Sequence, residues 1–186
     1  SVTYRTSGEI IFKDNTKLEL EDDFSWNGRY YVYGYGKFQG SRTQLESAIT
    51  LAYDTYGTVV DSNSKLVWKR YRSTQASIDG IVPVTSGDSI VNAVVAVSNY
   101  LGADFNAVSY MEQGHTAVET FDNIRGVHGI SLTGITYEKA LSYVGDGSPV
   151  IARIGEDEYI IITAYNSSEI AYIEASTGAQ KTASMN

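Results

Sequence analysis

Ser89-Ile-Val-Asn-Ala-Val-Val-Ala-Val-Ser-Asn-Tyr-Leu-Gly102 is the stretch that decides the fold of this chain. Apolar residues occur nearly all round a helix drawn through it, which predicts a buried helix over 88–101. The side chain of Asp88 or Ser89 is placed to accept hydrogen bonds from the free amides of the first turn, and Gly102 is placed to end the helix. We therefore expect a central helix in the core.

Strands are predicted after this helix. Glu158-Tyr-Ile-Ile-Ile-Thr-Ala-Tyr-Asn166 is rich in the β-branched and aromatic residues that favour strands. Further strands are predicted near 149–154 and 169–174, with a hairpin turn at Gly155–Glu158. We expect these strands to form one antiparallel sheet that packs on the helix.

Two helical segments are predicted near the central helix. Ser73 to Ile78 predicts a short helix ahead of it. The pattern from Phe105 to Ile124 predicts helix in pieces, with Gly114 as a break and a second piece over Thr116 to Phe121. Both segments are expected to belong to the same domain, over residues 73–186.

Residues 1–72 are predicted to form a separate, small α/β module. Its expected elements are a hairpin of Glu9–Lys13 and Lys17–Leu20 about an Asp14-Asn15 turn, a helix over 41–56 stopped by Gly57, and a hairpin of 58–61 and 65–70. The whole chain is therefore expected to be α+β.

Arg29-Tyr-Tyr-Val-Tyr-Gly-Tyr-Gly36 gives the strongest strand signal of this module. Alternation places Tyr30, Val32 and Gly34 on one face and the other tyrosines on the opposite face. If this strand lies at the rim of its sheet, its free amides and carbonyls would pair with a strand from a second subunit or a peptide. Self-association is therefore one expectation, and a central strand with both faces covered is the other.

The central helix and the strand at Glu158 together resemble the papain-like fold of the bacteriocin-processing, double-glycine-leader peptidase family. Ser89 falls where that family has its catalytic Cys, Glu158 where it has His, and Glu174, before Ala175, where it has Asp. The segments 132–153 and 66–72 also resemble the stretches that precede the base-bearing strand and the domain itself. The resemblance implies a papain-like domain of a bacterial surface or secreted protein.

The three replaced positions exclude the chemistry of that family. The chain contains no cysteine, and such a peptidase needs a thiolate whose proton is moved by a neighbouring imidazole. A serine hydroxyl needs a positioned base, and a carboxylate with an ordinary pKa of about 4.3 is a weak one. We therefore expect a catalytically inactive binding or structural module, with no cofactor and with a peptide or protein partner.

A serine-dependent hydrolase is the alternative that stays open. It would use Ser89 with His115 or His128 as its base, and a ring nitrogen of that histidine would have to lie within hydrogen-bond reach of the hydroxyl. Neither histidine has a companion at metal-ligand spacing. Both are expected to be structural or surface residues, and no metal site is expected.

Charge and composition set the expected surroundings of the chain. Its 14 Lys and Arg against 22 Asp and Glu give a formal net charge of −8, which repels nucleic acid. No stretch approaches the roughly 20 apolar residues of a membrane span. The first residue is Ser rather than Met, which is typical of a processed or excised chain. An acidic, tyrosine-rich, cysteine-free composition favours an extracellular or cell-surface location.

Overall fold

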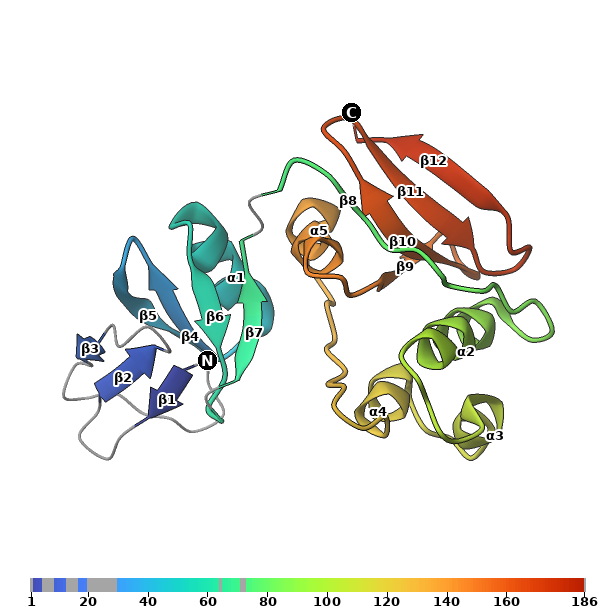
Figure 1. The fold of residues 1–186 in the computed structure, drawn as a ribbon, viewed down its shortest axis with the longest axis horizontal. Coiled ribbons are helices and arrows are strands. Elements are labelled where there is room, and N and C mark those ends of the chain that lie inside the picture. Colours follow the sequence, from blue (N-terminus) through green and yellow to red (C-terminus); the bar gives the residue numbers. More distant parts are fainter. Residues whose placement is uncertain are drawn as a thin grey trace. The chain divides into compact units, whose positions relative to one another are not determined.

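The computed structural model describes residues 2–4, 9–12, 17–19, 30–63, 65–70 and 73–185. The chain divides into two compact units, the first made of Ser1–Tyr71 and Leu132–Ser142 and the second of Arg72–Ser131 and Tyr143–Asn186 (Figure 1). Helices and antiparallel sheets both occur, so the fold is α+β.

The first unit contains residues 132–142, which the expected division into 1–72 and 73–186 places in the second domain. Residues 132–142 carry the first part of helix α5 (Tyr137–Gly145). The indole Nε1 of Trp68 donates a hydrogen bond to the carbonyl oxygen of Lys139 at 2.8 Å, and Lys139 Nζ donates one to Thr50 Oγ1 at 3.1 Å. Because Trp68 is only 2% exposed, the start of α5 completes the packing around it.

A four-stranded antiparallel sheet and one helix form the centre of the first unit. The strand order is β5 (Lys37–Arg42), β4 (Tyr30–Gly34), β6 (Thr58–Val60), β7 (Leu66–Lys69), and the helix is α1 (Leu45–Asp54). The predicted helix and the predicted β6–β7 hairpin are confirmed. Ala48, Ile49 and Ala52 of α1 are fully buried, as are Val59 and Val60 of β6.

Strand β4 is a central strand, which confirms one of the two expectations for 29–36 and contradicts the other, a free edge open to self-association. It pairs with β5 on one side and with β6 on the other. Tyr31 and Val32 are fully buried and Tyr33 is 3% exposed, so both faces of the strand are covered. The strand ends at Gly34, and Tyr35 and Gly36 form a turn into β5. Arg29 lies outside the described residues.

Three further strands lie near the start of the chain. They are β1 (Val2–Tyr4), β2 (Glu9–Phe12) and β3 (Lys17–Glu19), and they form an antiparallel sheet in that order. The predicted hairpin of β2 and β3 is confirmed. Its turn at Asp14 and Asn15 lies outside the described residues.

A five-stranded antiparallel sheet is the framework of the second unit. Its strands are β8 (Ala76–Ser77), β9 (Val150–Ile154), β10 (Glu158–Tyr165), β11 (Glu169–Glu174) and β12 (Gln180–Ser184). Strand β10 is central, because it pairs with β11 along one edge and with β9 and β8 in succession along the other (Figure 1). The predicted shared sheet of β9, β10 and β11 is confirmed.

Helix α2 (Ser89–Tyr100) packs on β10, and its residues from Asn92 to Ser98 are buried. The prediction of a buried central helix is therefore confirmed. Helices α3 (Ala107–Glu112) and α4 (Ala117–Asp122) follow, with the break at Gly114 that the sequence predicts. Gly114 has a φ of +95°, a conformation that side chains rarely adopt.

The short helix predicted over Ser73 to Ile78 is wrong. Ala76 and Ser77 form β8, which pairs with Tyr165 and Ala164 at the end of β10. Backbone pairing to an existing strand prevails here over a weak local preference for helix. Among the described helices, none has the length and apolar character needed to cross a membrane.

Candidate functional site at the start of helix α2

The hydroxyl of Ser89 connects the first turn of α2 to the start of β10. Its Oγ accepts a hydrogen bond from the backbone N–H of Tyr159 at 2.8 Å. Asp88 takes the N-cap position with an extended backbone, but its side chain makes no capping hydrogen bond. The predicted N-cap position is confirmed at Asp88, whereas the expected capping hydrogen bond is not formed by either side chain, because the Ser89 hydroxyl accepts from the Tyr159 N–H of β10 instead.

Asn92 forms a second connection one turn further along the helix. Its Oδ1 accepts from the N–H of Gly87 at 2.8 Å, and its Nδ2 donates to the carbonyl oxygen of Ala175 at 3.0 Å. The residue is only 1% exposed, so both amide atoms are satisfied inside the protein. Sequence reasoning missed this residue, although an amide side chain in the middle of an apolar run signals a buried polar contact.

Glu158 is the first residue of β10 and holds the turn that follows β11. Its Oε1 accepts from the N–H of Ser176 at 3.2 Å. The next residue, Tyr159, accepts at its carbonyl oxygen from the N–H of Ala175 at 3.0 Å. The carboxylate thus lies beside the turn whose first residue is also bound by Asn92.

Glu174, the last residue of β11, is engaged by two side chains. Its Oε1 accepts from the hydroxyl of Thr177 at 2.9 Å, and its Oε2 pairs with Lys181 Nζ at 2.7 Å. The hydrogen bond from Lys181, followed by that from Thr177, lowers the pKa of Glu174. The same contact raises the pKa of Lys181, to which the charge of Glu158 also contributes.

This ion pair gives a testable dependence of stability on pH. A carboxyl whose pKa is lower in the folded state stabilises the fold fully above its unfolded pKa, and this is lost as pH falls through the folded pKa. For Glu174 the loss therefore begins below the ordinary value of 4.5. In urea unfolding experiments, we expect the free energy of unfolding of Glu174→Gln to fall less than that of the wild type as the pH is lowered. Equal losses in both proteins would contradict this assignment.

The structure thus brings Ser89, Glu158 and Glu174 to the same region of the second unit. Each of the three side chains accepts a hydrogen bond from a neighbouring turn, strand or side chain. This arrangement ties α2 to the sheet, and among the described residues the hydrogen bond of the Ser89 hydroxyl is the one from the Tyr159 N–H. Ser89 and Glu158 accept backbone hydrogen bonds here, and Glu174 accepts from two side chains.

Both histidines have carboxylate partners of their own. His115 Nδ1 lies 3.1 Å from Glu119 Oε2, and its ring stacks on Tyr110 with centroids 3.8 Å apart. His128 Nδ1 lies 3.1 Å from Asp122 Oδ1. Within the described part of the chain, neither histidine makes a hydrogen bond with Ser89. No cluster of metal-binding side chains occurs there either.

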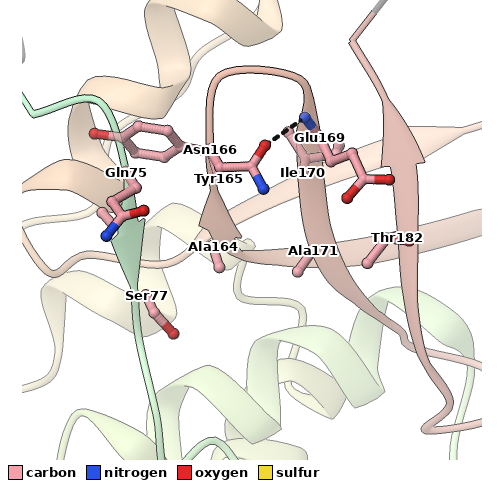
Figure 2. A pocket seen from close by; sticks show the side chains of 10 residues that line it. Gln75, Ser77, Ala164, Tyr165, Asn166, Glu169, Ile170, Ala171 and Thr182 are labelled. Atoms are coloured by element: carbon pink, nitrogen blue, oxygen red, sulfur yellow. Dashed lines mark hydrogen bonds between the residues drawn. The ribbon is translucent and has the colours of Figure 1, made fainter.

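A hollow of about 420 Å³ lies at the other end of β10, over β8, β11 and β12 (Figure 2). Small side chains from four neighbouring strands line up across it, with Ser77 opposite Ala164, Ala164 opposite Ala171, and Ala171 opposite Thr182. Asn166 at its rim accepts from the N–H of Glu169 at 2.9 Å, the dashed line in Figure 2. Its volume falls within the roughly 300–1,000 Å³ of small-ligand sites.

The described residues form an α+β fold in which polar side chains at the start of α2 connect this buried helix to the central strand β10. Comparisons of the chain with protein-family models, with curated proteins and with solved structures found no match. The assignment of function therefore depends on the geometry described above.

Proposed function

We propose that this chain carries a catalytically inactive, papain-like domain that serves as a binding or structural module of a secreted or cell-surface bacterial protein. The observation that carries this proposal is the hydrogen bond from the Tyr159 N–H to the Ser89 hydroxyl, 2.8 Å long. In a peptidase the group at the start of this helix attacks the substrate. Here the group at that position accepts a bond within the fold.

The packing of α2 supports the papain-like part of the proposal. The resemblance implies a buried helix with the nucleophile at its first residue and a central antiparallel strand with the base at its start. Here the first residue of α2 contacts the start of β10. Glu158 stands at the start of that strand and Glu174 at the end of the next one. These placements support a papain-like arrangement in which serine and two glutamates stand where the resemblance implies the nucleophile, the base and the third group.

Proton transfer is the step that these side chains lack. A serine becomes nucleophilic when a base, oriented by a third group, takes its proton. Glu158 is bound to the N–H of Ser176, and Glu174 is paired with Lys181. The alternative of a serine hydrolase gains no support from either histidine, because both are paired with other carboxylates.

A peptide or protein is the partner that we propose for this module. The hollow over β8, β10 and β11 supports this choice, because its floor of small side chains leaves room for a side chain of a bound segment. Polar groups at its rim, such as Gln75 and Asn166, are suited to bind a peptide backbone. The acidic, cysteine-free composition supports an extracellular or cell-surface location.

Labelling with a broad serine-reactive fluorophosphonate tests the proposal. We expect the wild type and Ser89→Ala to be labelled equally and only at background level, because the Ser89 hydroxyl accepts from the Tyr159 N–H and, in the described part of the chain, neither histidine bonds to it. A catalytic serine of a known serine hydrolase, labelled in parallel, is the positive control. Labelling of the wild type that Ser89→Ala abolishes would show that the chain is a hydrolase.

A further inference from the structure

The hollow at the end of β10 has a floor of small side chains and a polar rim. Four small residues pair across the sheet to form the floor: Ser77, Ala164, Ala171 and Thr182. Side chains two positions apart along an extended chain lie on the same face. Gln75, Asn166 and Glu169 therefore stand beside this floor, on the same face of the sheet (Figure 2).

Glu169 carries the only charge among the residues that line the hollow. Its backbone N–H is bound by Asn166 Oδ1 at 2.9 Å. Its carboxylate has no hydrogen-bond or ion-pair partner among the described residues. A carboxylate without a cation beside it attracts a positively charged group, so the rim favours a cationic ligand.

The other charges around the hollow strengthen this preference. The hydroxyl of Ser77 donates a hydrogen bond to Asp79 Oδ1 at 3.4 Å, which places a second carboxylate on the β8 side. Lys181 follows the alternation of β12 to the face opposite Thr182, and it is paired there with Glu174 at 2.7 Å. The whole chain has a formal net charge of −8. A negatively charged ligand would therefore be repelled.

The side-chain amide of Asn166 is held in one orientation at the rim. Its Oδ1 accepts from the N–H groups of Ser168 and Glu169, both at 2.9 Å, and from the hydroxyl of Ser168 at 3.2 Å. The oxygen is thus used by the turn, and the nitrogen lies on the side of the hollow (Figure 2). Nδ2 carries two N–H donors, which have no acceptor among the described residues. A peptide carbonyl suits these donors.

The length of the floor fits a short extended peptide. Neighbouring strands lie about 4.8 Å apart, so the row of four from Ser77 to Thr182 is roughly 14 Å long. An extended chain advances about 3.3 Å per residue, so about four residues laid across the strands would cover this row. Lysine and arginine have apolar stems that pack on such a floor while their charged ends stay at a polar rim.

We propose that the hollow binds an extended peptide through one lysine or arginine side chain, whose stem lies on Ala164 and Ala171 and whose charged end pairs with Glu169. The Nδ2 of Asn166 donates to a carbonyl of the same peptide. This inference rests on the proposed function, in which the partner is a peptide or protein, and it names the chemistry that the partner presents. The hollow lies at the opposite end of β10 from the contact of Ser89 with Tyr159.

The test is an NMR titration of the ¹⁵N-labelled full chain with two five-residue peptides, blocked at both ends. One peptide has a central lysine between alanines, and the other has norleucine there, which keeps the apolar stem without the ammonium group. We expect the lysine peptide to shift the amide signals of Ala164, Ala171 and Thr182 with a Kd on the order of 1 mM. The norleucine peptide should bind about two- to fivefold more weakly, which is the usual strength of an exposed ion pair.

Glu169→Gln should remove the difference between the two peptides, because it removes the charge and keeps the shape of the side chain. The matched control is Glu156→Gln in the turn between β9 and β10, which should keep the difference. Both glutamates are exposed, so both variants should stay folded. Ala171→Leu fills the floor and should weaken the binding of both peptides.

Equal binding of the two peptides by the wild type, or a lysine preference that Glu169→Gln retains, would overturn the pairing with Glu169 and leave a module that binds peptides. Absence of shifts at the hollow, or unchanged binding by Ala171→Leu, would overturn the site itself. Failure of the proposed function is seen separately, as fluorophosphonate labelling that depends on Ser89.

Discussion

Gly57→Ala is expected to destabilise the first unit by about 3 kcal/mol or more, because the added methyl group has no space. A Cβ at Gly57 would lie 1.9 Å from the carbonyl oxygen of Tyr33 and 2.9 Å from the Cα of Gly34. Both atoms belong to the backbone of β4, so no side-chain rotation relieves the overlap. The strand would have to move away from β6.

Urea unfolding followed by tryptophan fluorescence measures this loss, because both tryptophans fall within residues 1–71. The matched control is Gly36→Ala, where a Cβ meets nothing within 4 Å and the backbone has a φ of +75°. That variant should lose only about 1 kcal/mol, the cost of a left-handed alanine. Equal losses at the two glycines would contradict the close approach of Gly57 to β4.

Asn92→Ala is expected to destabilise the second unit by about 2–6 kcal/mol, because it leaves two backbone groups without a partner at about 1–3 kcal/mol each. Those groups are the N–H of Gly87 and the carbonyl of Ala175. Gly87 precedes α2 and Ala175 follows β11. Loss of the two hydrogen bonds should therefore loosen the contact between the helix and the sheet.

The matched control is Asn99→Ala, since Asn99 lies on the same helix but is exposed. An exposed substitution of this kind should change the free energy of unfolding by about 0.5 kcal/mol or less. Circular dichroism during urea unfolding gives both values. If Asn92→Ala were as mild as the control, the connection through Asn92 would not contribute to stability.

The sequence predicted the parts of the fold that carry a strong local pattern. The apolar run after Ser89 identifies α2 as a buried helix, and the β-branched residues after Glu158 identify β10 as a strand. The hairpins and α1 follow from turn residues and helical spacing. In each of these segments the local preference and the tertiary contacts favour the same structure.

The sequence did not predict the elements that depend on distant partners. Strand β12, with the polar sequence Gln180-Lys-Thr-Ala-Ser184, forms by pairing with β11, and β8 forms by pairing with β10. The place of residues 132–142 in the first unit depends on Trp68 and Lys139, which are 71 positions apart. Local periodicity carries no information about such contacts.

The sequence predicted the candidate site only in part. Ser89, Glu158 and Glu174, which the resemblance singles out, lie in one region of the second unit. The resemblance could not predict that the Ser89 hydroxyl would accept from a strand amide, because a serine at a helix start more often caps the helix. The turn at Tyr35 was also missed, since tyrosine is an unusual residue at a positive φ.

Hydrogen exchange at the Tyr159 amide tests most directly whether Ser89 is a structural acceptor. We expect this amide to be protected in the wild type and in Ser89→Thr, which keeps a hydroxyl, and to exchange up to about tenfold faster in Ser89→Ala. The magnitude follows from a net hydrogen-bond contribution of about 0.5–1.5 kcal/mol. The amide of Ile161, further along β10, should be unaffected. Equal exchange of the Tyr159 amide in the wild type and Ser89→Ala would contradict the account.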